Sequence, residues 1–336
     1  MFARPAAPAP RPRALSAWLL TVAALVFLMV VVGGITRLTE SGLSMVRWEP
    51  ISGAIPPLND AQWQAELDHY KESPQYQQVN HGMSLSDFKA IYFWEYLHRL
   101  LGRLIGLAFA LPFAWFAWRR AIPPGFGWKL GGILALGALQ GAIGWWMVAS
   151  GLVDRPEVSH IRLAIHLLTA LLIFASLIWV ALDLRKPARI PLLGIWTLCL
   201  LYLQFMFGAY VAGLDAGYAF NSWPKMGEDW YPAGAEWMSP ALRNFVDNPI
   251  TVQFVHRWLA FAVAALAIAL AAKAIRSRLP WEAAALALAV TAQITLGILT
   301  LLSGVQIDIA ATHQGMAVLL LAMVVVTAHR LGDARP

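Results

Sequence analysis

Four histidines of the chain divide two to each half: His98 in EYLHR, His166 in LAIHLL, His256 in QFVHR and His313 in AATHQG. Each lies within or beside a long apolar segment. A neutral imidazole ring supplies one axial ligand to iron, and two such rings on facing helices complete a six-coordinate haem. We therefore predict two haem sites, one between the two histidines of each half.

One half carries an ionisable group that the other half lacks. Where the first half has Glu95 three residues before its histidine, the second half has Gln253. This spacing places Glu95 on the same helical face as the histidine. A carboxyl group at the edge of an apolar site suits proton transfer or the balancing of a positive charge. Alternatively, Glu95 forms an ion pair with Arg99 or Arg103, since intramembrane carboxylates often pair.

An arginine directly follows one histidine of each half, Arg99 in the first and Arg257 in the second. The planar fork of a guanidinium group matches a carboxylate through two parallel hydrogen bonds. Haem carries propionate carboxylates at its edge. We predict that Arg99 and Arg257 bind these propionates.

The segments that carry these residues must be membrane-spanning helices. Of the 336 residues, 59% are hydrophobic and 13% charged, and the mean hydropathy is +0.59. A bilayer core of about 30 Å needs about 20 apolar residues per helix. The one cysteine, Cys199, falls in an apolar segment, where we expect it to be buried. Eight segments predict an all-α integral membrane protein, near residues 16–36, 92–118, 130–150, 163–182, 190–212, 251–273, 281–303 and 310–328.

Basic residues indicate which ends of these segments face the cytoplasm. With the N-terminus inside, the inner segments hold fourteen Lys and Arg but only three Asp and Glu, as the positive-inside rule requires. Residues 1–15 are then a cytoplasmic tail, both termini are cytoplasmic, and the histidines lie toward the outer, periplasmic face. We infer a multi-pass protein of the bacterial cytoplasmic membrane, in contact with lipid. Its net charge of +6 belongs to the inner loops and does not indicate nucleic-acid binding.

The second half of the chain repeats the first. At an offset of 175 residues Gly33 matches Gly208, at 158 EYLHR matches QFVHR, and at 153 LQGAIGWWMVASG matches AQITLGILTLLSG. Each half is a four-helix unit, residues 16–189 and 190–336, and four spans return the chain to its starting side. Such parallel repeats predict two four-helix bundles related by a pseudo-two-fold axis along the membrane normal.

The repeat leaves two choices for the partner of His313 in the first half. Without a gap His313 matches His160, whereas removal of a six-residue insertion in the loop VDRPEVS matches it to His166. We prefer His166, because both histidines then stand in the pattern A-x-H. His160 is then expected in the outer loop, and a role for it as a ligand is left open.

The loop after the first apolar segment predicts a further helix outside the membrane. Residues 59–73 place Leu67 and Tyr70 on one helical face. This face either lies at the membrane interface or packs on the outer end of the bundle. Ser84 and Asp87 then form a capping box, so that the next helix begins before it enters the bilayer.

Together these motifs resemble haem A synthase, in its proteobacterial and mitochondrial branch. The resemblance covers nearly the whole chain, in GGITRLTESGLSMVRWEP, EYLHRLLGR, GWWMVASGL, RLAIHLL, QFVHR and ATHQG. EYLHR with three further spaced histidines is the specific part of this signature. Another branch of the family carries a cysteine pair in the outer loops. This chain has one cysteine, so a mechanism that needs the pair is not expected here.

The resemblance implies an enzyme that oxidises the C8 methyl group of haem O to a formyl group, giving haem A for cytochrome oxidase. It implies that His256 and His313 bind a haem b cofactor in the second half. It also implies that His98 and His166 bind the iron of the substrate haem O, with Glu95 as the catalytic carboxylate. Haem O synthase and a second copy of the chain are candidate partners, and the electron donor is left open.

Two other functions would use the same histidines. A di-haem cytochrome b that passes electrons from a quinol needs all four, but it gives no role to Glu95 in one half alone. A haem transporter would bind haem more weakly and needs an open path. Production of haem A would separate the enzyme from both alternatives.

Overall fold

The structure is a computed structural model that describes residues 11–47, 49, 52–233 and 235–333. These residues form helices, turns and loops and no β-strand. Eight helices are long and apolar enough to cross a membrane, as predicted. They are α1 (Pro12–Leu38), α4 (Leu85–Trp118), α5 (Gly127–Ala149), α6 (His160–Asp183), α7 (Leu192–Gly213), α9 (Pro249–Arg276), α10 (Pro280–Leu302) and α11 (Ile307–Arg330).

The long helices begin where the local sequence favours a start. α1 begins at Pro12, ahead of the predicted span, because proline is well tolerated in the first helical turn. α4 begins after Ser84, whose side chain accepts a hydrogen bond from the Asp87 N–H, as the predicted capping box requires. α6 begins at His160 after the N-cap Ser159. His160 is therefore the first residue of a helix, and its placement in the loop was wrong.

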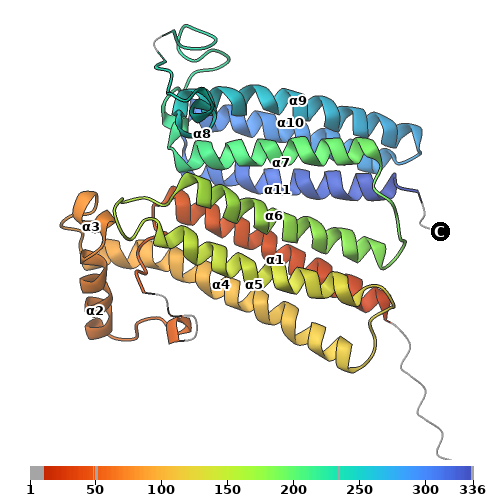
Figure 1. Cartoon of the computed structure of the whole chain (residues 1–336), viewed down its shortest axis with the longest axis horizontal. Helices are drawn as coiled ribbons and strands as arrows, with labels where there is room; N and C mark the ends of the chain where they lie inside the picture. The colour runs from red at the N-terminus through yellow and green to blue at the C-terminus, as the bar shows by residue number, and fades with distance from the viewer. Residues whose placement is uncertain (1–10, 48, 50–51, 234, 334–336) are drawn as a thin grey trace, which may run out of the picture.

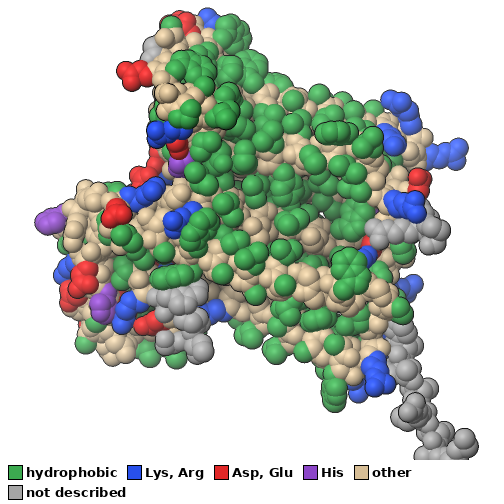
Figure 2. Space-filling view, in the orientation of Figure 1, with side chains coloured by type: hydrophobic (Ala, Val, Ile, Leu, Met, Phe, Trp, Pro, Cys, Tyr) green, Lys and Arg blue, Asp and Glu red, His purple; other side chains and the backbone are tan. Residues whose placement is uncertain are grey.

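The start of α1 and the end of α11 lie at the same end of the bundle (Figure 1). The short helices α2 (Asp60–Lys71), α3 (Pro74–Gln78) and α8 (Asn244–Asp247) lie at the opposite end (Figure 1). Hydrophobic side chains cover the surface between the two ends (Figure 2). Basic side chains with few acidic ones lie at one end, and basic and acidic side chains lie together at the other (Figure 2). An apolar belt between charged ends is expected of a membrane-spanning bundle. Cys199 is exposed on α7, so its expected burial was wrong: lipid-facing positions are apolar too.

The helices pack in the pattern that a two-fold repeat predicts. α1 packs on α4 and α6 as α7 packs on α9 and α11, and α5 packs on α6 as α10 packs on α11. Between the halves, α1 packs on α11, α6 packs on α7, and α6 meets α11. The repeat matches α1 to α7 and α6 to α11. The contact between α1 and α11 therefore corresponds to the contact between α7 and α6, and the contact between α6 and α11 corresponds to itself. The packing is therefore that of a pseudo-two-fold axis passing between α6 and α11.

One hydrophobic core extends through both halves. Polar contacts cross between them as well. The Gln314 side chain on α11 donates to the Val30 carbonyl on α1 at 2.8 Å. Arg37, at the end of α1, donates to both carboxylate oxygens of Asp215 at 2.9 Å. The halves thus form one packed unit.

A buried charged cluster lies where α6 and α11 end. Asp183 on α6 lies 2.8 Å from the Lys129 ammonium of α5 and 3.2 Å from the His329 ring of α11. The Asp183 side chain is fully buried. A buried carboxylate needs such partners to offset its desolvation, so this cluster ties three helices together where they end.

The predicted outer helix packs on the bundle. Leu67 and Tyr70 of α2 are buried against Phe88 and Tyr92, which belong to the first turns of α4. The Tyr70 and Phe88 ring centroids are 5.3 Å apart. Packing on the bundle end, the second of the two predicted possibilities, therefore describes α2.

Candidate haem-binding sites

The two histidines of the first half face each other across the bundle. His98 on α4 and His166 on α6 have ring centroids 6.5 Å apart. Two metal–nitrogen bonds of about 2 Å and two ring radii of about 1 Å require roughly 6 Å between the centroids of two rings that share one iron. The separation therefore suits bis-histidine ligation. His256 on α9 and His313 on α11 belong to two helices that pack on each other.

Each of the four rings packs against a glycine on a neighbouring helix. A Cβ atom added at Gly33 or Gly144 would lie 2.8 or 2.9 Å from Cε1 of His98 or His166, respectively. In the second half, a Cβ atom at Gly208 would lie 3.0 Å from Cε1 of His256, and one at Gly297 would lie 2.9 Å from Cε1 of His313. These distances leave no room for a larger residue. The repeat matches Gly33 to Gly208 and Gly144 to Gly297, so each half packs its two histidine rings against glycines at corresponding positions. We call this packing the glycine cradle.

Glutamine amides from the neighbouring helices lie beside three of the rings. The Gln140 Nε2 atom is 3.1 Å from Nδ1 of His166, and the Gln204 Nε2 atom is 3.1 Å from Nδ1 of His256. The Gln293 Nε2 atom lies 3.4 Å from the ring of His313. The sequence analysis assigned no role to these glutamines, although the repeat already matched Gln140 to Gln293.

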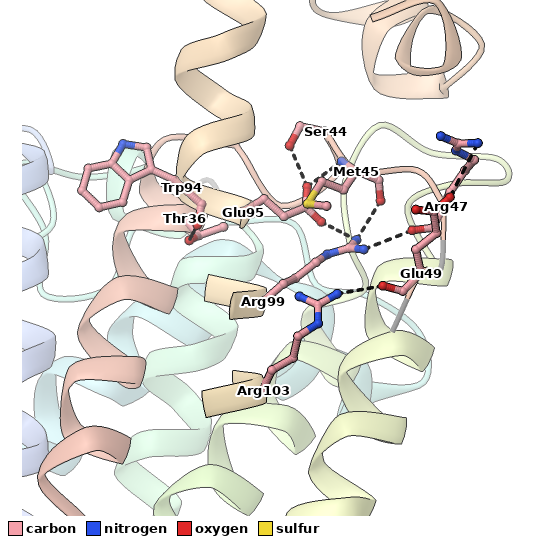
Figure 3. Close-up of polar contacts among 9 residues, drawn as sticks. All are labelled: Thr36, Ser44, Met45, Arg47, Glu49, Trp94, Glu95, Arg99 and Arg103. Carbon is pink, nitrogen blue, oxygen red and sulfur yellow. Dashed lines mark hydrogen bonds and ion pairs between the residues drawn. The ribbon is translucent and has the colours of Figure 1, made fainter. Parts of the chain in front are cut away.

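The carboxylate of Glu95 is buried and accepts three hydrogen bonds (Figure 3). One oxygen accepts from the Ser44 hydroxyl and the Met45 N–H, both at 2.7 Å. The other oxygen accepts from the Arg99 guanidinium at 2.6 Å. The predicted alternative, an ion pair with Arg99, is therefore present, whereas Arg103 donates to the Glu49 carbonyl instead. In this arrangement Glu95 fastens the outer loop to α4.

Arg99 contributes to the same fastening (Figure 3). Its guanidinium donates to the Met45 carbonyl at 2.7 Å and to the Arg47 carbonyl at 3.1 Å. These contacts hold an extended segment of the outer loop beside the first-half site.

The second half repeats this arrangement with one chemical change. Arg257 donates to the carbonyls of Phe220 and Ser222, both at 2.8 Å, and these residues match Met45 and Arg47 at the 175-residue offset. Gln253, in the place of Glu95, donates its amide to the Phe220 carbonyl at 3.0 Å. In the first half, the Glu95 carboxylate thus accepts hydrogen bonds from the loop. In the second half, the Gln253 amide donates a hydrogen bond to the corresponding loop.

Both arginines that we predicted to bind propionates are thus engaged by loop carbonyls. The sequence could not reveal these contacts. Every residue has a backbone carbonyl, so the residue type does not indicate which carbonyl accepts a hydrogen bond. One buried donor of Arg257, Nε, has no hydrogen-bond partner among the described residues. Propionate binding by Arg99 and Arg257 stays a prediction.

His160 lies at the seam between the halves. Its Nε2 atom is 3.2 Å from a carboxylate oxygen of Asp247, and its ring centroid is 5.6 Å from that of Tyr210. Both partners belong to the second half. His166, and not His160, makes the ring contact with His98.

The histidine sites suit a metal that brings most of its own ligands. No group of three or more His, Cys, Asp and Glu side chains that could hold a bare metal ion occurs in the described part of the chain. Buried Nδ1 atoms of His98 and His313 have no hydrogen-bond partner among the described residues. Paired rings packed against glycines suit a haem site, in which the macrocycle supplies the other four ligands.

Comparison with known proteins gives matches along almost the whole chain. The family model described as cytochrome oxidase assembly protein matches residues 16–325. The chain is 56% identical over 341 residues to the haem A synthase of Rhizorhabdus wittichii, covering 98% of each chain. It is 50% identical over 332 residues to the haem A synthase of Sphingopyxis alaskensis, covering 96% of this chain and 94% of the relative.

Proposed function

Because the chain belongs to the cytochrome oxidase assembly protein family and is similar over its full length to haem A synthases, we propose that it is a haem A synthase. The reaction is oxidation of the C8 methyl group of haem O to a formyl group. The protein is a multi-pass membrane protein with eight spanning helices. In the proposed orientation, both termini lie in the cytoplasm and the histidines lie toward the outer face.

We assign different tasks to the two halves. His256 and His313 are proposed to hold a haem b cofactor, with both rings set by their glycine cradles and flanking glutamines. A haem with two histidine ligands supplies electron transfer. His98 and His166 are proposed to hold the iron of haem O, so that the substrate lies next to Glu95. The observation that carries this assignment is the asymmetry between Glu95 and Gln253 in otherwise matching surroundings.

Glu95 places a negative charge one helical turn from His98. Its three partners are all hydrogen-bond donors, so its oxygens are fixed as acceptors at the outer edge of the first-half site. Positive charge that develops on a substrate during oxidation is stabilised by a preorganised carboxylate nearby. Gln253 has a similar shape but no charge, which suits a half that only relays electrons.

The proposed function is tested by pigment extraction. Membranes from a host that makes haem O are extracted with and without this protein, and the haems are separated by chromatography. We expect haem A only where the protein is present. Two bound haems with no haem A would overturn the proposal in favour of a cytochrome b that only passes electrons.

A further inference from the structure

Three of the four histidines have a glutamine partner and the fourth has none. Gln140 and Gln293 occupy matching positions of the repeat and lie beside His166 and His313. Gln204 on α7 lies beside His256. At the 175-residue offset that matches Gly33 to Gly208, the counterpart of Gln204 is Met29 on α1. Nδ1 of His98 is buried and has no hydrogen-bond partner among the described residues. Nδ1 of His313 is also unpaired there, because Gln293 lies beside Nε2 of that ring.

The packing around the two rings is otherwise alike. Gly33 lies against Cε1 of His98 as Gly208 lies against Cε1 of His256. The Met29 side chain reaches α4, where its terminal methyl would lie 3.0 Å from a Cβ atom added at Gly102, one turn after the histidine. At this position the second half therefore has a hydrogen-bonding amide beside its ring, and the first half has an apolar side chain packed on α4.

The Gln204 amide is anchored as well as close to the ring. Its Nε2 atom donates to the His256 carbonyl at 2.9 Å and lies 3.1 Å from Nδ1 of the same residue. Its Oε1 atom is buried with no partner in the described part of the chain. As placed, the Gln204 amide donates to an unprotonated Nδ1. An iron-bound ring carries a proton on Nδ1, and the amide can accept it through Oε1 once it turns over and gives up its bond to the His256 carbonyl. Methionine offers only a weak acceptor sulfur.

Hydrogen bonds to the second nitrogen of a ligating histidine fix the ring orientation and strengthen it as a ligand, and their loss costs about 10–100-fold in metal affinity. We propose that Gln204 is a positioning residue that makes His256 a permanent haem ligand. Met29, at the equivalent position, leaves His98 as the ligand that can leave the iron. The second half thereby retains its haem, while the first half can take up a substrate and release a product. This inference rests on the proposed function, which assigns cofactor and substrate to these halves.

The test is a pair of reciprocal substitutions in the full-length protein, purified with bound haem. Gln204→Met is expected to lower haem affinity by about 10–100-fold and to let the reduced haem bind carbon monoxide. Met29→Gln is expected to slow haem transfer from the first half to apomyoglobin by about tenfold. Leu203→Met is the matched control, because Leu203 neighbours Gln204 but is 39% exposed on the surface of α7. The control should leave the haem spectrum unchanged.

A folded Gln204→Met protein with wild-type haem affinity and no carbon monoxide binding would overturn the inference. An unchanged transfer rate in Met29→Gln would also overturn it. If Gln204→Met does not fold, Gln204→Glu decides: a carboxylate beside Nδ1 should lower the midpoint potential of the haem, and an unchanged potential counts against the proposal. Formation of haem A by the wild-type protein tests the proposed function separately. Haem A with unchanged variant spectra would overturn only the positioning role.

Discussion

At the scale of single residues, the proposed catalytic role of Glu95 can be separated from its contacts with the outer loop. We predict that Glu95→Gln lowers haem A formation by at least about a hundredfold, the usual contribution of a catalytic acid, base or charge, while haem b stays bound in the second half. The substituted amide still accepts from Arg99, but its NH2 group meets a donor in the outer loop. The measurement is haem extraction and chromatography, together with a melting curve.

Two variants control this experiment. Ser44→Ala removes one of the three donors to Glu95 and keeps its charge, at a cost of about 1 kcal/mol of stability, so most of the activity should remain. Gln253→Glu should have little effect on activity. Normal haem A yield from a stable Glu95→Gln protein would show that the carboxylate only fastens the loop.

The glycine cradles give a second prediction at this scale. Gly144→Ala places a methyl group 2.9 Å from the His166 ring and should displace it, with loss of haem binding in the first half. Gly141→Ala, three residues away on the same helix, meets nothing within 4 Å and should bind haem normally. Equal haem content in both variants, measured by pyridine haemochrome, would contradict the cradle.

Ligand replacement should separate the two sites by spectrum. We expect the six-coordinate low-spin haem b spectrum of the purified protein to survive His98→Ala and to disappear in His256→Ala or His313→Ala. The reason is that the retained cofactor is assigned to the second half. Equal loss of the stable haem from His98→Ala and His256→Ala would refute that assignment.

The roles of the site residues could be predicted from sequence only where they depend on the chemistry of the side chain itself. Histidine pairing followed from the repeat, and the contact between His98 and His166 agrees with it. The contacts of Arg99 did not follow, because its partners are main-chain carbonyls of Met45 and Arg47. Glu95 fell between these cases: its ion pair with Arg99 was one of two roles that the sequence left open.

At the scale of the helices, the number of spans followed from apolar length, whereas their ends depended on local chemistry. α4 is 34 residues long, longer than the roughly 20 residues that cross a bilayer, because α2 buries its outer turns. His160 begins α6 because Ser159 caps it, a contact that alignment of the repeat could not reveal.

The topology is tested by reporters placed between the helices. Fusions after Arg120, Arg189 and Arg278 should report the cytoplasm, because these positions lie among the basic inner loops. Fusions near Gln75, Glu236 and Gln306 should report the outer side. Any one of the six on the wrong side would break the eight-span order and the common depth of the histidines.

At the scale of the whole molecule, the two halves are held together by the helices that flank the pseudo-two-fold axis. We predict that residues 1–189 and 190–336, expressed as separate chains in one cell, assemble and bind haem. The apolar seam formed by α1, α6, α7 and α11 does not need a covalent link to pack. A tag on one chain should recover the other. Halves that purify apart, each folded, would show that the connecting loop is essential.

The same two-fold seam has a consequence for descent. A free four-helix unit with this face would bind a copy of itself, because a two-fold interface joins the same surface on both partners. Such an ancestral dimer would have two identical haem sites, and any mutation would alter both haem sites at once. Joining two genes end to end removes that constraint. After the fusion, each half could change independently. The first half could have Glu95 and Met29 where the second half has Gln253 and Gln204. Two identical haem sites could then become one site for electron transfer and one for the substrate.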